Sequence, residues 1–220
     1  LEALKRHDIR VGEIIECLKE SGIYENTTLI LLGDHSAIDT HKVIRLNSIF
    51  REEELIELKD GKLKSFKAIA RECGGSCYIY LDNKNKKYEN KCLEVLERLK
   101  EEGALEYILN KEEAIKAGAN DQCDFMVEAT RGYYFSNEYE GKVIEETKDI
   151  KNKYTYKAVH GYSPRKKDYG TFFLAFGRGI KSGVVLEEGK LINHGPTLGR
   201  ILGFSFQKAD GIIEERILKL

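Results

Sequence analysis

The chain has 220 residues, with 36 basic and 37 acidic side chains, so its formal net charge at pH 7 is −1. This length is sufficient for one large domain with a full hydrophobic core. The balanced charge excludes a global basic field that would attract nucleic acid or acidic lipid. A membrane span needs about 20 apolar residues, whereas the apolar runs here are only strand-sized, so we expect no span in this chain.

The first 35 residues predict a helix followed by a buried strand. Apolar residues recur near a 3.6-residue period over residues 2–21, and Gly22 ends this pattern. Residues 27–32 form a continuous β-favouring run, which is typical of a strand buried on both faces. This order predicts an α/β fold with a parallel sheet, in which functional residues follow the carboxyl ends of strands. The residues at that position are Gly33, Asp34 and His35.

The middle of the chain predicts a small α+β region. We expect strands at 43–46, 66–70, 76–81, 105–109 and 124–135, and helices at 52–58, 87–102 and 111–117. The charged stretch 138–153 predicts a hairpin or loop that leads out of this region. We therefore expect residues 1–45 and 154–220 to form one α/β core, and residues 46–153 to form an α+β insertion with a cap-like position.

The α/β pattern returns in the last third of the chain. Residues 156–159 and 171–176 predict strands, and the first of them runs into His160. Residues 196–202 predict a helix, because Pro196 stands in its first turn and Gly203 just past its end. The isoleucines near the carboxyl terminus predict a last strand or helix.

The five cysteines are scattered and contain no CxxC pair, which predicts reduced and mostly buried thiols. Cys73 and Cys77 are the only close pair, and their neighbours offer no further zinc ligands. Unpaired cysteines favour a reducing, cytoplasmic compartment. An extracellular location stays open, because the chain begins with Leu1 and we expect its true start to lie upstream.

Two short motifs suggest metal chemistry. Asp34 and His35 directly follow the first predicted strand, and carboxylate and imidazole are both ligands for divalent metals. Gly33 and Ser36 are small enough to let the chain bend so that both side chains reach one ion. A capped loop is the alternative for this pair. His160 before Gly161 is the second candidate, with a hydrogen-bonded loop histidine as its alternative.

Other residues are candidates for the substrate side. His41 and Lys42 follow the Asp-His pair, with a solvated loop as the alternative. The basic run 165–167 beside His160 would attract phosphate, unless it is a solvated charge run. Residues 131–133 are either a substrate contact or a turn, and we expect His194 to pack against or cap its helix.

Five ordered strings carry a resemblance. They are Asp8-x2-Val11-Gly12-x-Ile14-Ile15-x2-Leu18, Thr27 to His35, His160-Gly161-Tyr162-x-Pro164, Phe173 to Ile180, and Pro196 to Gly203. In order and spacing they resemble segments of the type I phosphodiesterase and nucleotide pyrophosphatase family, within the alkaline phosphatase superfamily. The resemblance covers most of the chain and is loose between residues 50 and 150. It implies an alkaline-phosphatase-like α/β fold, with a mixed or parallel sheet flanked by helices.

The resemblance also implies a two-zinc phosphoesterase that acts on a small phosphate ester or nucleotide. In this family Asp34 and His35 would bind the ion that also holds a Thr or Ser nucleophile, and His160 would bind the other ion. Two such ions stabilise the attacking and leaving oxygens of an in-line displacement. The nucleophile forms a covalent intermediate, which water then releases.

The chain departs from the family pattern because it lacks the nucleophile, the first metal-binding Asp and an Asp-x3-His pair. Thr27 and Thr28 lie at the wrong end of the strand to replace the nucleophile. The resemblance therefore implies the carboxy-terminal part of a larger domain, inactive by itself and with no catalytic residue of its own. Two alternatives stay open. One is a phosphomonoesterase, phosphonate hydrolase, sulfatase or phosphomutase of the same superfamily, and the other is a non-catalytic module with a degenerate copy of the fold.

Overall fold

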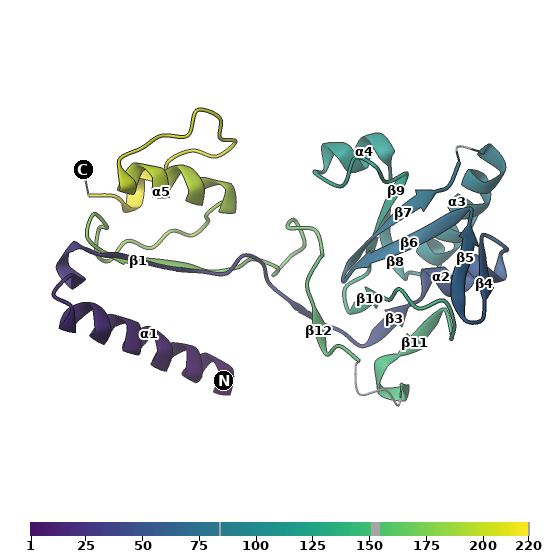
Figure 1. The fold of residues 1–220 in the computed structure, drawn as a ribbon, viewed down its shortest axis with the longest axis horizontal. Coiled ribbons are helices and arrows are strands. Elements are labelled where there is room, and N and C mark those ends of the chain that lie inside the picture. Colours follow the sequence, from purple (N-terminus) through teal and green to yellow (C-terminus); the bar gives the residue numbers. More distant parts are fainter. Residues whose placement is uncertain (84, 151–154, 220) are drawn as a thin grey trace. The chain divides into compact units, whose positions relative to one another are not determined.

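The computed structural model describes residues 1–83, 85–150 and 155–219, and it shows a mixed α/β chain (Figure 1). Two compact units are present: unit 1 comprises Leu1–Asp34 and Thr171–Leu220, and unit 2 comprises His35–Gly170. From the sequence, residues 1–45 and 154–220 are assigned to a hydrolase core and residues 46–153 to an insertion, and this division stays a prediction. Its second boundary lies outside the described residues. In the described part of the chain, no helix combines the length and apolar character that a membrane crossing requires.

Unit 1 is built around a two-stranded ribbon. Its elements are α1 (Glu2–Glu20), η1 (Tyr24–Asn26), β1 (Thr28–Leu32), β13 (Phe173–Gly177), η3 (Leu191–Asn193), α5 (His194–Leu202) and η4 (Glu215–Ile217). β1 pairs with β13 in antiparallel fashion, with Ile30 opposite Ala175, and α1 and α5 flank this ribbon in Figure 1. The prediction of a parallel strand buried on both faces is wrong for β1, whose residues are at most partly buried. An apolar run predicts a strand but does not specify its partner or what covers it.

Unit 1 buries little apolar surface by itself. Among its described residues, the buried members of its apolar core are Ile180, Ile217 and Leu218. α1 is amphipathic as predicted, yet it has no buried residue, and Leu4 and Ile14 remain 68% and 52% exposed. α5 ends as predicted, because Gly203 adopts a left-handed φ of 81° just past its last turn. The predicted last element is only the single turn η4.

Unit 2 contains the main sheet and the main core. The sheet has the order β6–β7–β9–β8, formed by β6 (Ala68–Cys73), β7 (Ser76–Leu81), β9 (Phe125–Ala129) and β8 (Leu105–Asn110), and every neighbouring pair is antiparallel. α3 (Lys86–Glu101) packs on this sheet (Figure 1). The apolar face that the 3.6-residue period predicts for α3 is buried completely, as Cys92, Val95, Leu96 and Leu99 show. α4 (Lys111–Lys116) begins with a capping box formed by Asn110 and Glu113.

Short strands pair the first residues of unit 2 with residues near its carboxyl end. β2 (Ile38–Asp39) pairs in antiparallel fashion with β12 (Ala158–Val159). β3 (Lys42–Ile44) lies between β10 (Tyr133–Phe135) and β11 (Ile144–Glu146), and η2 (Thr147–Asp149) follows. Thus the predicted strand 124–135 is two strands joined by a turn. The stretch 138–153 contains β11 and η2, and its last three residues lie outside the described residues.

The predicted helix at 52–58 is wrong. The helix in this region is α2 (Leu46–Glu52), and residues that follow it form a hairpin of β4 (Ile56–Lys59) and β5 (Lys62–Phe66). Glu54 adopts a positive φ of 57°, which ends the helical path, and Leu55 then enters the core with 1% exposure. The acidic run favours a helix locally, but burial of the adjacent apolar residues decides the outcome.

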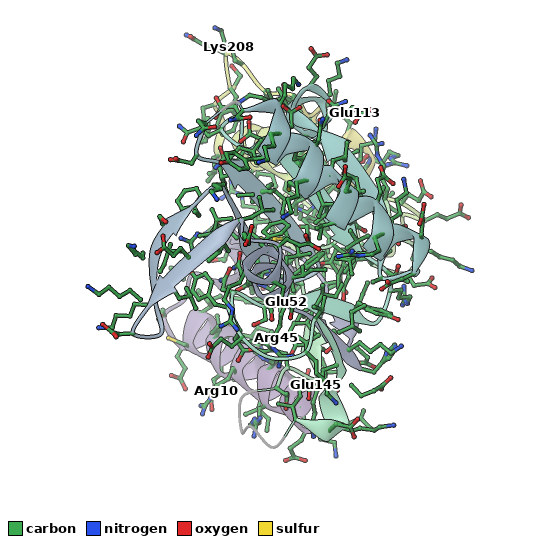
Figure 2. The ribbon with its side chains drawn as sticks, turned by 90° about the vertical axis from the view of Figure 1, so that its right-hand side faces the viewer. Arg10, Arg45, Glu52, Glu113, Glu145 and Lys208 are labelled. Atoms are coloured by element: carbon green, nitrogen blue, oxygen red, sulfur yellow. The ribbon has the colours of Figure 1, made fainter. Side chains whose placement is uncertain are left out.

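A nearly buried arginine ties the segment 138–145 to this part of unit 2. The guanidinium of Arg45 donates hydrogen bonds to Glu138, to the carbonyl of Lys142 at 3.0 Å and to Glu145 at 2.9 Å. Figure 2 labels Arg45 and Glu145 in this region. Because the side chain is only 7% exposed, its charge needs these partners. The charged stretch that follows β10 is therefore held in place and not simply solvated.

Candidate functional site

Two of the predicted metal ligands lie in contact. The imidazole rings of His35 and His160 stack with their centroids 4.3 Å apart and an angle of 22° between the ring planes. The β2–β12 ladder produces this contact, because Val159 pairs with Ile38 and so brings the ends of two distant segments together. Neither ring lies in the core, since both histidines are exposed. The fold thus joins two residues that the sequence analysis selected from separate motifs.

The ring of His35 is oriented by its own backbone neighbour. Its Nδ1 atom lies 3.2 Å from the carbonyl oxygen of Ser36, a distance that suits a hydrogen bond when Nδ1 carries the proton. Metal-ligating histidines typically donate one ring N–H to a carbonyl or carboxylate, which fixes the ring for the other nitrogen to bind metal. The local geometry of His35 is therefore of the kind that a ligand position requires.

Asp34 is the last residue of the first segment of unit 1, directly before His35. Gly33 precedes it and donates its N–H to the carbonyl of Phe172 at 3.1 Å. A Cβ atom at position 33 would lie 2.1 Å from the hydroxyl oxygen of Thr171, so any larger residue here would have to displace that side chain. The carboxylate of Asp34 is exposed. The end of β1 thus continues into the Asp-His pair through a tightly packed glycine.

The donors present are of the right kind for zinc but incomplete in number. Imidazole and carboxylate are typical zinc ligands, and a protein zinc site uses three or four protein donors. Across residues 1–83, 85–150 and 155–219, no group of three or more His, Cys, Asp or Glu side chains is arranged to hold a metal ion. This chain would therefore supply part of a ligand set, and the metal role of Asp34, His35 and His160 stays a prediction.

His41 and Lys42 contact the turn between β9 and β10. The ring of His41 packs against Gly132 and makes an edge contact with Tyr133 at 5.8 Å. Lys42 donates a hydrogen bond to the Tyr133 hydroxyl at 2.9 Å and lies 3.6 Å from the carboxylate of Glu146. Arg131 and Gly132 form the expected turn and Tyr133 begins β10, while Arg131 donates to the carbonyl of Lys167 at 2.7 Å. A role of these residues toward substrate stays a prediction.

Lys166 corrects the interpretation of the basic run 165–167. Its side chain is only 5% exposed, and its ammonium lies 2.9 Å from Oε1 of the fully buried Glu128 and also pairs with Glu106. Lys166 is thus neither solvated nor available to attract phosphate, whereas Arg165 and Lys167 are exposed. The sequence reasoning missed Glu128. Its signal was a single charged residue within the apolar run Phe125–Ala129.

The remaining candidates have structural roles. His194 begins α5 and packs its ring against Phe173 with centroids 4.6 Å apart, and burial lowers its pKa. Packing of His194 is therefore confirmed. All five cysteines are free, as predicted, and three are buried: Cys77, Cys92 and Cys123. Burial raises the pKa of the Cys92 thiol to about 12, which makes it unreactive.

Comparisons with solved structures identify the fold. Human ectonucleotide pyrophosphatase/phosphodiesterase 5 matches with a TM-score of 0.73 at 16% sequence identity, over 100% of this chain and 52% of its own. The murine protein matches with a TM-score of 0.70 at 17% identity, over 97% of this chain and 51% of its own, and so does an inactive variant of it in complex with AMP. The chain thus spans about half the length of these structures. The alkaline-phosphatase-like fold class predicted from the sequence is confirmed for this part of the domain.

The comparison with curated proteins found no match. The sequence profile of the family described as type I phosphodiesterase / nucleotide pyrophosphatase matches residues 1–163. This match includes the Asp34-His35 and His160 motifs and most of the chain. Members of this family are phosphoric ester hydrolases, and they are generally metal-dependent. The chain therefore belongs to the type I phosphodiesterase/nucleotide pyrophosphatase family.

Proposed function

We propose that this chain is the carboxy-terminal part of a two-zinc phosphodiesterase or nucleotide pyrophosphatase. The observation that carries the proposal is the stacked pair of His35 and His160, two metal-ligand candidates from distant segments. Stacking by itself is compatible with a structural pair, but the family pattern requires a ligand at each of these positions. The proposal therefore joins the geometry to the family membership.

The three candidate ligands divide between two zinc sites. Asp34 and His35 contribute to one zinc site, and His160 contributes to the other. In this proposal the remaining ligands and a Thr or Ser nucleophile come from a part of the protein outside this chain, upstream of it. The finding that the chain spans only about half of the structures it resembles supports a contribution from outside it. When bound, two such ions polarise the phosphate and make a hydroxyl group nucleophilic.

The residues of this chain orient the ligands. The β2–β12 ladder brings His160 to His35, and the Ser36 carbonyl orients the His35 ring. A nucleotide or a similar small phosphate ester is the proposed substrate. The murine protein of similar fold, solved in complex with AMP as an inactive variant, supports this substrate class. The near-zero net charge of the chain means that attraction for phosphate would come from metal ions more than from the surface.

Comparison of diester and monoester hydrolysis tests the substrate class. For the full-length protein with zinc, we expect kcat/KM for bis(p-nitrophenyl) phosphate to exceed that for p-nitrophenyl phosphate by at least about tenfold, which corresponds to about 1.4 kcal/mol of transition-state discrimination. A reversed ratio would instead support a phosphomonoesterase of the same superfamily. Absence of both activities in a protein that is folded and loaded with zinc would support the non-catalytic module.

A further inference from the structure

We propose that Gly74, Gly161 and Tyr169 are positioning residues that fix the peptide bond after His160, and with it the direction in which the His160 side chain leaves the backbone. The inference rests on the proposed function, in which His160 is a metal ligand. It assigns a task to the β6–β7 hairpin, whose turn lies in the region where the family resemblance is loose.

Strand pairing alone holds the backbone at His160 only weakly. β12 consists of only two residues, and its partner β2 is equally short. The His160 side chain follows the end of this ladder and is exposed. A backbone that is held only by a two-residue ladder can shift, which opposes the fixed geometry that a metal ligand needs. A further restraint on the backbone at His160 is therefore required.

The peptide bond between His160 and Gly161 is held at both of its polar groups. Its carbonyl oxygen accepts a hydrogen bond from the N–H of Gly75 at 2.8 Å. Its N–H donates to the hydroxyl of Tyr169 at 3.0 Å. Because both groups belong to one planar unit, these two bonds fix the orientation of the whole peptide plane. The backbone position from which the His160 side chain extends is fixed with it.

Glycine is required at two positions for this contact. Gly161 has a φ of +84°, and a Cβ atom there would lie 1.6 Å from the carbonyl oxygen of Cys73. Gly74 has a φ of +72°, and a Cβ atom there would lie 2.3 Å from the carbonyl oxygen of His160. Any side chain at either position would therefore separate the hairpin turn from the His160 loop, besides straining the backbone.

The two partners of the peptide are themselves anchored. The turn of the β6–β7 hairpin accepts hydrogen bonds from Phe135 N–H at Gly74 and from Ala129 N–H at Gly75, both at 2.9 Å. Tyr169 is 7% exposed, and its ring makes an edge contact with Tyr162 at 5.7 Å. The restraint on His160 is thus connected to the core sheet of unit 2, which gives it a rigid base.

Tyr169→Phe tests the inference, because it removes one hydroxyl and keeps the buried ring. In the metal-stripped full-length protein, we expect the zinc dissociation constant from chelator competition to rise about tenfold, since loss of a partner that orients a ligand costs about 10–100-fold in metal affinity. We expect kcat for the diester to fall while KM stays within about twofold. The melting temperature of the metal-free protein is measured in parallel.

Tyr162→Phe is the matched control. It removes the hydroxyl of another buried tyrosine in the same loop, which donates to the carbonyl of Tyr133 and does not touch the His160–Gly161 peptide. We expect its zinc affinity to stay within about twofold of wild type at a comparable loss of melting temperature. Equal losses of zinc affinity in both variants would overturn the inference, because general loosening of the loop would then explain them.

His160→Ala separates this inference from the proposed function. If His160→Ala lowers zinc affinity and Tyr169→Phe does not, the positioning role is wrong and the proposed function stands. If His160→Ala leaves zinc affinity and hydrolysis unchanged, both are wrong. Gly161→Ala should lower zinc affinity more than Tyr169→Phe, and if it fails to fold, the tyrosine variants still decide the question.

Discussion

Replacement of Glu128 by Ala should lower the free energy of unfolding by about 3–5 kcal/mol, because it removes the buried counter-ion of Lys166 and leaves only the half-exposed Glu106 to pair with it. Glu128 is fully buried on β9, and one carboxylate oxygen accepts hydrogen bonds from the Tyr107 hydroxyl and from Ser163 N–H, the latter at 2.8 Å. Its other oxygen contacts the Lys166 ammonium at 2.9 Å, as an ion pair without hydrogen-bond alignment. Burial together with the hydrogen bond to Glu128 raises the pKa of Tyr107, so this hydroxyl remains a donor.

Urea denaturation of the wild-type and variant proteins measures this loss. Glu57→Ala is the control, because the Glu57–Lys64 pair is more than half exposed and should contribute at most about 1 kcal/mol. The double variant Glu128→Met with Lys166→Met should recover part of the lost stability, since no buried charge then lacks its partner, whereas the Tyr107 hydroxyl and the Ser163 N–H still lack an acceptor. A Glu128→Ala variant no less stable than Glu57→Ala would contradict this account of the loop after His160.

The second large effect concerns catalysis. We expect His160→Ala to lower kcat/KM for a nitrophenyl phosphodiester by more than about 100-fold in the full-length protein. Residues that only orient metal ligands already account for about 10–100-fold, so loss of a ligand itself should exceed that range. The variant should fold normally, because His160 is exposed and its ring contacts His35 at the surface.

His7→Ala is the matched control for this effect. His7 lies exposed on α1, outside every motif that carries the proposed metal site. Its replacement should leave kcat/KM within about twofold and the melting temperature unchanged, as surface substitutions usually do. If His160→Ala retained the activity of His7→Ala, His160 would have no role in the reaction.

The sequence predicted correctly those helices and strands whose formation depends on residues close together in the chain. The period of apolar residues located α3 and its buried face, and the Pro196 and Gly203 signals located α5 and its end. Alternating runs located the β6–β7 pair. In each case the residues that determine the element lie within the element or directly beside it, so one sequence is sufficient to find it.

Predictions failed where distant residues decide the structure. β1 was found as a strand, but its antiparallel partner β13 lies far along the chain and no local signal specifies it. The acidic run before Leu55 suggested a helix, whereas the core needs Leu55 and Ile56 at the start of a hairpin. Pairing and burial outweighed local propensity in both places.

The residues of the candidate site also fall into two groups: those that the sequence could indicate, and those whose role depends on contacts between distant segments. His35 and His160 could be selected from the sequence because their motifs combine a metal-binding side chain with glycine or a strand end. Tyr169 and Gly74 could not be selected, because their importance depends on a contact with the His160 peptide that only the folded chain creates. Glu128 had a visible signal in a charged residue within an apolar strand.

Metal content tests the central claim most directly, namely that His35 and His160 are ligands in a two-zinc hydrolase. The measurement is bound zinc per full-length protein molecule, by atomic absorption, after dialysis of wild type, His160→Ala and His7→Ala against the same trace of free zinc. We predict that wild type and His7→Ala bind about two ions and that His160→Ala binds about half as much. Equal zinc in all three proteins would contradict the account.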